Sequence, residues 1–265
     1  MDRPDSSGRV LLQRAEGVAR VTLSHPGRLN AISVAMWREL REAFQELSAD
    51  PSVRCVVVQG ADGHFAAGAD IREFPAERSG FDGVVNYHTR IIAPALQALA
   101  DCPHPVVARI EGACVGGGLE IACLCDLRIA ARGARFGVPI NRLGFSMAPH
   151  EMRGLLALAG KAVTLEILLE GRVFDADEAL AKGLLTRVVD PARLEEETAR
   201  SVARILRGAP LAARLNKLTL ARLQQAGSGP GPADWPVLFS YADSRDHREG
   251  VRAFLAGEDP VFQGD

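Results

Sequence analysis

The chain of 265 residues has almost no net charge, because 31 basic side chains are balanced by 33 acidic ones. No overall basic field is therefore present to attract nucleic acid or anionic lipid, and neither is expected as a partner. No apolar run reaches the roughly 18 residues that a membrane-spanning helix needs, and the first residues, MDRPDSSGRV, lack the apolar stretch of a signal peptide. We expect no membrane association, and an anionic small molecule would need a local basic cluster.

Cysteine is also scarce, with five residues and no Cys-x-x-Cys pair, which excludes a disulfide scaffold and argues against zinc. A reducing, cytoplasmic location is expected. Cys123 and Cys125 lie two residues apart, so on a helix they point to different faces, and we predict buried packing residues. His64 and His88 have no carboxylate or cysteine partner at metal-ligand spacing, and no metal site is predicted.

Hydrophobic residues make up 47% of the chain, enough for a sizeable core. Residues 10–13 and 18–23 form a hairpin-like opening, and apolar side chains at helical spacing follow over residues 33–48. The alternation continues with a buried strand over 53–59, a helix over 84–99, a strand over 105–111, a helix over 117–124 and a strand over 127–131. This order predicts the α/β class with a largely buried sheet.

Helices dominate the second half of the chain. Helical segments are predicted over 155–158, 163–169 and 176–182, a last strand over 184–189, and amphipathic helices over 191–206 and 210–225. A turn-rich break at 227–236 and a helical stretch over 237–255 complete the chain. We place a domain boundary near Arg207, which divides residues 1–207 from residues 208–265.

Two glycine-containing segments have local chemistry that core packing does not explain. Small residues in FAAGADIR, residues 65–72, expose main-chain N–H groups, although a tight turn would also explain them. In residues 112–126, GACVGGGLEIACLCD, three glycines precede a helix whose first N–H groups can stabilise negative charge. The spacing fits neither a dinucleotide motif nor a P-loop. Glu120, between Leu119 and Ile121, is a carboxylate among apolar residues, so helix stabilisation and acid–base work both remain open.

Together FAAGADIREF and GACVGGGLEIACLCDLRIAA resemble the enoyl-CoA hydratase/isomerase, or crotonase, family. Three further segments agree in order: LNA at 29–31, FGVP at 136–139 and GRVFDADEALAKG at 171–183. The resemblance spans nearly the whole chain. It implies a crotonase-like (ClpP/crotonase) spiral of ββα units in residues 1–207 and a C-terminal helical trimerisation region in residues 208–265, with homotrimers or hexamers.

The resemblance also implies a chemistry. The amides of Ala69 and Gly117 would bind the thioester oxygen of an acyl-CoA and stabilise the enolate that forms from it. Glu120 matches the first of two glutamates that family hydratases use, one to add water at Cβ and one to manage the proton at Cα. No cofactor is implied beyond the coenzyme A that the substrate carries. Residues implied in binding the coenzyme A portion are Arg28, Ala66, Gly68, Asp70, Ile71 and Arg72, and residues 248–254 resemble a region that can complete this pocket in a neighbouring subunit.

The chain departs from the family at the second glutamate, where Ile140 stands in FGVPI, and residues 147–152, MAPHEM, replace the family's glycine-rich stretch. Hydration of 2-enoyl-CoA is the favoured reaction. Isomerisation of 3-enoyl-CoA with Glu120 as sole acid and base, another reaction such as decarboxylation, and binding of CoA thioesters without catalysis are the alternatives. His150 or Glu151 would be another source of the second group, although residues at a helix start are usually caps or surface charges.

Overall fold

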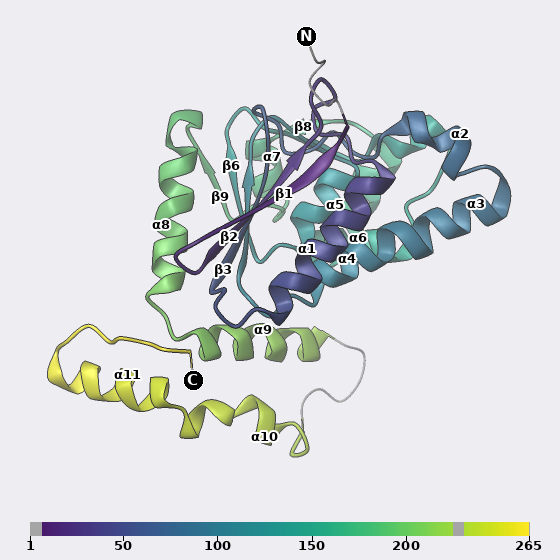
Figure 1. The fold of residues 1–265 in the computed structure, drawn as a ribbon. Helices are drawn as coiled ribbons and strands as arrows, with labels where there is room; N and C mark the ends of the chain where they lie inside the picture. The colour runs from purple at the N-terminus through teal and green to yellow at the C-terminus, as the bar shows by residue number, and fades with distance from the viewer. Residues whose placement is uncertain (1–6, 225–230, 265) are drawn as a thin grey trace, which may run out of the picture.

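The computed structural model describes residues 7–224 and 231–264, and a six-stranded sheet organises its larger part (Figure 1). The strand order is β1-β2-β3-β4-β6-β9, in which β1 and β2 form the antiparallel hairpin and all other pairs are parallel. These strands are β1 (Arg9–Ala15), β2 (Val18–Ser24), β3 (Cys55–Gly60), β4 (Val106–Ile110), β6 (Leu127–Ala131) and β9 (Arg187–Val189). Parallel neighbours joined through helices confirm the predicted α/β class.

A second, three-stranded sheet escaped prediction because its strands are only two or three residues long. It has the order β5-β7-β8 and consists of β5 (Ala113–Val115), β7 (Arg135–Gly137) and β8 (Phe174–Asp175). Strand β5 leads directly into the glycine-rich start of the next helix, so this small sheet fixes the backbone beside the site.

Helices cover both faces of the main sheet (Figure 1). In β3, Val56 and Val58 belong to the main core, whereas Cys55 and Val57 pack toward α8. A strand buried on both faces reads as a continuous apolar run, which is why this one was visible in the sequence. The main core includes residues of α1 (Val34–Ala49), α4 (Ala93–Ala100), α5 (Gly117–Leu124) and α6 (Pro149–Glu170), and the other face is covered by α8 (Leu194–Leu206).

Several predicted elements are confirmed closely. Ser33 caps α1 by accepting a hydrogen bond from the Met36 amide, and Trp37 is fully buried on the inner face of that helix. Helix α5 and strand β6 have the predicted limits, and Cys123 and Cys125 are buried. No helix in residues 7–224 or 231–264 is long and apolar enough to cross a membrane.

Four predicted helical segments differ from the structure. The one over 84–99 is split by a π-helical turn, η2 (Tyr87–Ile92), between α3 (Gly80–Asn86) and α4. The two short segments after residue 155 belong to one helix, α6, which is interrupted at Gly160, where φ is +69°. The stretch over 237–255 is divided into α10 (Trp235–Leu238), a 3-10 turn over Ser240–Asp243 and α11 (Arg245–Ala256), with Ser244 as the cap of α11. Side-chain periodicity does not reveal such breaks because the apolar spacing continues across them.

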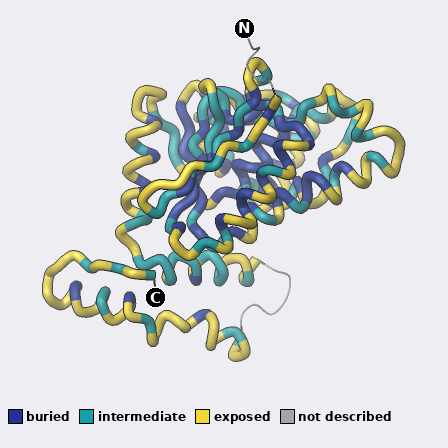
Figure 2. Tube along the Cα trace, in the orientation of Figure 1, coloured by how far each residue is buried: buried dark blue, intermediate teal, exposed yellow. Residues whose placement is uncertain are grey.

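The remaining helices connect these parts. They are η1 (Ile71–Glu73), α2 (Phe74–Glu77), η3 (Pro139–Leu143), α7 (Ala176–Ala181), η4 (Pro191–Arg193) and α9 (Pro210–Gln224). Helix α9 is tied to the sheet by Lys217, whose Nζ lies 2.7 Å from Asp126 Oδ2 and 2.7 Å from the His104 carbonyl oxygen. Helices α10 and α11 lie beyond α9, and most of their residues are exposed (Figure 2). Part of the predicted break at 227–236 lies outside the described residues.

Candidate active site

Two loops bring the amides of Ala69 and Gly117 to one pocket. Gly68 has φ of +99°, and a Cβ placed on it would lie 3.2 Å from the Val115 carbonyl oxygen and 3.8 Å from the Gly117 nitrogen, so the loops are in contact. The Ile32 amide donates to the Gly68 carbonyl at 2.7 Å, and the Asp70 amide donates to the Ile32 carbonyl at 2.9 Å. These bonds explain why the LNA segment accompanies this loop.

Neither the Ala69 amide nor the Gly117 amide has an acceptor in the described part of the chain. Gly117 is the first residue of α5, where N–H groups have no partner within the helix. Two unpaired donors beside a pocket form a site for an oxyanion.

The glycines at the start of α5 are required by close packing. A Cβ on Gly117 would lie 3.0 Å from Trp37 Cζ2, and a Cβ on Gly118 would lie 2.4 Å from the Ala66 carbonyl oxygen. Any larger residue at 118 would push α5 away from the loop that carries Ala69. The three glycines therefore set the distance between the two donors.

Glu120 lies in the first turn of α5 and is only 7% exposed. Burial raises the pKa of its carboxyl group well above the ordinary value, and the negative charge of Glu151 nearby raises it further. No described hydrogen-bond donor reaches this carboxyl group. The environment of Glu120 thus favours the protonated form, which is what a proton donor needs.

Glu151, one of the two residues considered as a source of the second group, lies in the same pocket as Glu120. A Cβ on Gly154 would lie 3.0 Å from Leu124 Cδ2 and 3.1 Å from Cys123 Cβ, so α6 packs closely on α5 at that point. Glu151 lies one turn before Gly154 in α6, and Glu120 lies one turn before Cys123 in α5. The two carboxyl groups therefore lie on the same side of the contact between these helices. Glu151 is 5% exposed.

Each oxygen of Glu151 has a different partner. Oε2 accepts a hydrogen bond from the Ala148 amide at 3.4 Å, which is the expected role of a glutamate in a first helical turn. Oε1 lies 2.5 Å from Nδ1 of His88. The hydrogen of this contact lies on His88 Nδ1 when Glu151 is ionised, because a carboxylate can only accept. Glu151 therefore has both the contact expected at a helix start and a contact to His88 that the sequence does not show.

His88 comes from the π-helical turn η2, 63 residues away from Glu151 in the chain. The wider i→i+5 turn directs Tyr87, His88 and Ile92 together into the pocket. No sign of the contact between His88 and Glu151 is visible in the sequence, because the two residues lie far apart in the chain. His150, the other residue considered as a source of the second group, is exposed and does not line the pocket.

The remaining predicted residues divide into two groups. Gly68, Ala69, Ile71 and Gly117 line the pocket with Glu120. Ala66 is fully buried behind the loop, and Arg28, Asp70 and Arg72 lie outside the lining. Arg28 NH1 lies 3.7 Å from Asp70 Oδ2, and Asp70 Oδ1 accepts from the Arg72 amide at 3.2 Å. Binding of coenzyme A by these residues stays a prediction.

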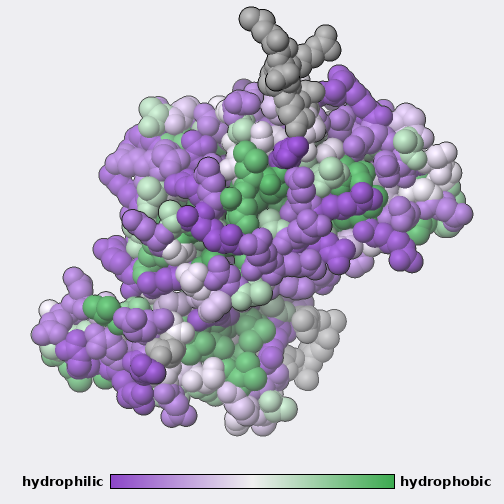
Figure 3. Space-filling model, in the orientation of Figure 1, coloured by the Kyte–Doolittle hydropathy of each residue, from purple (hydrophilic) through white to green (hydrophobic). Residues whose placement is uncertain are grey.

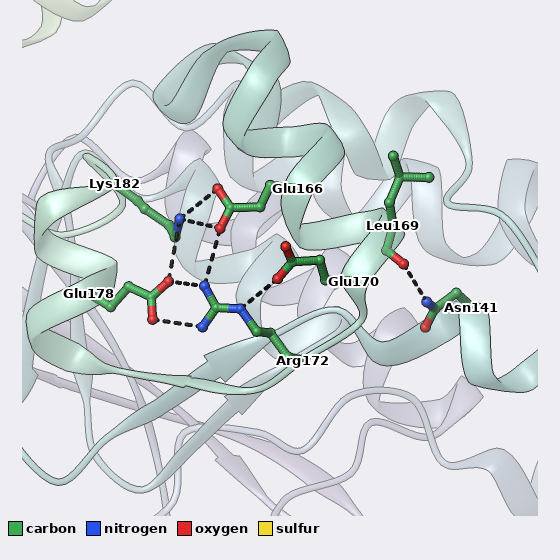
Figure 4. Close-up of polar contacts among 7 residues, drawn as sticks. All are labelled: Asn141, Glu166, Leu169, Glu170, Arg172, Glu178 and Lys182. Atoms are coloured by element: carbon green, nitrogen blue, oxygen red, sulfur yellow. Dashed lines mark hydrogen bonds and ion pairs between the residues drawn. The ribbon is translucent and has the colours of Figure 1, made fainter.

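The segment that replaces the family's second glutamate is firmly attached to α6. Ile140 lines the pocket from η3, and its neighbour Asn141 donates through Nδ2 to the Leu169 carbonyl oxygen at 2.9 Å (Figure 4). Gly171 has φ of +56°, and a Cβ on it would lie 2.0 Å from Asn141 Oδ1, so a larger residue there would displace the Asn141 side chain. This attachment holds an apolar side chain in the pocket wall.

Beside it, an ion-pair network joins the end of α6 to α7 (Figure 4). Arg172 Nε lies 2.7 Å from Glu170 Oε2, and Lys182 Nζ lies 2.7 Å from Glu166 Oε1. Glu178 bridges both cations. A network of this kind holds the C-terminal end of the helix whose N-terminal end carries Glu151.

Several pocket residues had no functional signal in the sequence. Trp37 was assigned to core packing, and Phe74, Arg78, Tyr87 and Phe145 were not singled out. All five line the pocket. Trp37 Nε1 and Tyr87 Oη are buried and have no hydrogen-bond partner in residues 7–224 or 231–264. Only the folded chain brings these residues together.

Two free amides and two buried carboxyl groups at one pocket form an arrangement of the kind found in enzymes, one that can stabilise an oxyanion and move protons. The family model for enoyl-CoA hydratase/isomerase matches residues 13–265. The chain therefore belongs to the enoyl-CoA hydratase/isomerase (crotonase) family, and it is a family enzyme with the crotonase fold.

Individual relatives support this assignment. A probable enoyl-CoA hydratase from Rhizobium meliloti is 34% identical over 97% of this chain and 99% of its own length. An (E)-benzylidenesuccinyl-CoA hydratase from Thauera aromatica is 30% identical over 96% of this chain and 99% of its own length. A crystal structure titled enoyl-CoA hydratase/carnitine racemase, from Magnetospirillum magneticum, is 44% identical and covers 97% of this chain and 96% of its own, with a TM-score of 0.94.

Proposed function

We propose that this chain adds water to 2-enoyl-CoA thioesters, with Ala69 and Gly117 as oxyanion donors and Glu120 and Glu151 as the acid–base pair. The observation that carries the proposal is the presence of Glu151 beside Glu120, since hydration requires one group at Cβ and another at Cα. Glu151 would thus supply the carboxylate that is absent at Ile140. The names of the relatives from Rhizobium meliloti and Thauera aromatica agree with this reaction.

The different environments of the two carboxyl groups suggest roles opposite to those that the family resemblance implies, with Glu151 acting at Cβ and Glu120 at Cα. Glu151, held by His88, takes a proton from water as the oxygen attacks Cβ. The C=C electron pair moves toward the thioester, whose oxygen becomes negative between the Ala69 and Gly117 amides. Glu120, whose pKa burial raises, then gives its proton to Cα. One water is consumed, and proton exchange between the two carboxyl groups restores the starting state.

The apolar side chain of Ile140 favours a second candidate, the isomerisation of 3-enoyl-CoA to 2-enoyl-CoA. That reaction needs one base to remove a proton at one carbon and return it at another, which Glu120 alone can do beside the oxyanion donors. Glu151 would then have no part in the chemistry.

A direct experiment separates these reactions. The wild type, Glu120→Gln and Glu151→Gln are incubated with crotonyl-CoA and, separately, with a 3-enoyl-CoA in deuterated water. Loss of the conjugated thioester absorbance and deuterium at Cα are followed. Hydration that is lost in both variants supports the proposal. Conversion of the 3-enoyl thioester that needs Glu120 but not Glu151 favours the isomerase, and no reaction with either thioester favours another acyl-CoA reaction such as decarboxylation, or binding alone.

We further propose that residues 208–265 form a trimerisation region. An apolar groove between α9 and α11 is lined by Leu211, Val251, Phe254 and Leu255. Phe254 is 85% exposed and Leu255 is 80% exposed, and apolar side chains gather in this part of the molecule (Figure 3). Large exposed apolar side chains on one face are typical of a contact surface. Light scattering coupled to size exclusion tests this proposal, and a monomeric mass would contradict it.

A further inference from the structure

One wall of the pocket carries a cation without an acidic partner. Arg78 is half-buried at the end of α2 and lines the pocket with Glu120 and Glu151. Within residues 7–224 and 231–264 its guanidinium has no ion pair or hydrogen bond with a side chain, and its partners are aromatic rings. Arg28, in contrast, already lies 3.7 Å from Asp70. Arg78 is thus a pocket cation that no described carboxylate neutralises.

The aromatic rings of Phe74 and Phe145 pack against the guanidinium group of Arg78. Its Cζ lies 4.3 Å from the ring centre of Phe74 and 4.1 Å from that of Phe145, and the two rings are themselves in edge contact at 6.0 Å. Such stacking positions the plane of a guanidinium and removes water from its faces, but it leaves the N–H groups at the edge free. A guanidinium edge fits a carboxylate with two parallel hydrogen bonds.

Tyr87 is a second unused donor beside Arg78. Its side chain is 1% exposed, its hydroxyl group has no partner among the described residues, and its ring centre lies 5.5 Å from Arg78 Cζ. Tyr87 lines the same pocket as Arg78 and the two carboxyl groups. A buried polar group without a partner is costly, so this wall is suited to a polar ligand and not to an alkyl chain.

We propose that Arg78 and Tyr87 bind a carboxylate on the acyl group, and that the substrates of this chain are thioesters whose acyl portion carries a second, free carboxylate. The inference rests on the proposed function, because it assumes that a CoA thioester occupies the pocket. The thioester oxygen lies at the Ala69 and Gly117 amides, and the reacting carbons lie beside the two glutamates. The carboxylate of the acyl group then extends to Arg78. A phosphate of coenzyme A is the other anion that Arg78 can bind, and the experiment distinguishes the two.

The experiment measures binding of saturated thioesters by calorimetry, so that no reaction is needed. The probes are glutaryl-CoA against pentanoyl-CoA and adipyl-CoA against hexanoyl-CoA, which are matched in chain length, with free coenzyme A as the reference. The wild type is expected to bind at least one carboxylated thioester about ten- to a hundred-fold more tightly than its matched partner. Arg78→Met, which keeps the aliphatic stem, is expected to remove this preference while binding the methyl-ended thioesters as before.

Two further variants complete the test. Tyr87→Phe is expected to reduce the preference several-fold, and Arg90→Met is expected to leave it unchanged, because Arg90 is exposed and outside the pocket. Equal affinity for both members of each pair in the wild type overturns the inference while the proposed function stands. A uniform loss in Arg78→Met that includes free coenzyme A also overturns it, since Arg78 would then bind a phosphate. Binding of no thioester at all overturns the inference and the proposed function together.

Discussion

The starts of α5 and α6 differ in how they present a carboxylate to the same pocket. In α5 the site is local: three glycines, a free amide and Glu120 lie within a few residues of one another. In α6 it is assembled from distant parts of the chain, since Glu151 depends on His88 from η2 and on the contact of Gly154 with α5. A short motif can indicate the first kind of site. The second kind exists only after folding, although it can be equally important to the reaction.

Removing each carboxylate in turn is expected to have the largest effect on activity. Glu120→Gln and Glu151→Gln are each expected to lower kcat for 2-enoyl-CoA hydration by about 10²- to 10⁴-fold, because each removes one proton-transfer group. Steady-state kinetics with crotonyl-CoA provides the measurement. Glu42→Gln, on the exposed face of α1, is the control and should retain full activity. If Glu151→Gln were as active as the control, α6 would contribute a helix cap and nothing more.

Substitution of His88 tests whether Glu151 needs a hydrogen-bond partner from outside α6. Loss of a hydrogen bond to a charged group predicts a fall in kcat of about ten- to a hundred-fold for His88→Ala, with little change in KM. His88→Gln retains a donor and should recover part of the rate at neutral pH, and the pH profile of kcat should differ between the two variants. A fall confined to KM would mean that His88 contacts the substrate instead of positioning Glu151.

Disturbing the close contact between α5 and α6 is expected to have a smaller effect, which is measured as a change in the free energy of unfolding. Gly154→Val places side-chain atoms where even a Cβ would lie 3.0 Å from Leu124 Cδ2. Overpacking of this kind lowers the free energy of unfolding by about 1–3 kcal/mol, which denaturant titration can measure. Gly133→Ala is the matched control, because nothing lies within 4 Å of a Cβ there. An unchanged stability in Gly154→Val would show that α6 can shift away from α5 at no cost.

The sequence alone was sufficient for the α/β class, the crotonase resemblance and the loops of Ala69 and Gly117, because these depend on local patterns. Glu120 stood out as a charge within an apolar run. Glu151 did not, because its neighbours His150 and Met152 give no sign of burial, and a first-turn glutamate has an ordinary capping role. Arg78 had no signal either, since Phe145, which contacts it, lies in a distant segment of the chain. Contacts across such separations depend on the tertiary structure.

The stability of the fold should depend on pH, because the carboxyl group of Glu120 is buried in the folded protein and exposed to water in the unfolded chain. Burial raises its pKa in the folded state above the unfolded value of about 4.3. Between these two values the folded state binds more protons than the unfolded state, so the contribution of Glu120 to stability falls as pH rises. Glu120→Gln has no such group and should become increasingly stable relative to the wild type from about pH 4 upward. Unfolding free energies at several pH values give the measurement, with Glu42→Gln as the exposed control. A stability difference that is constant across this range would mean that Glu120 titrates in the folded protein as it does in water, and the proton it is proposed to donate to Cα would then be absent at neutral pH.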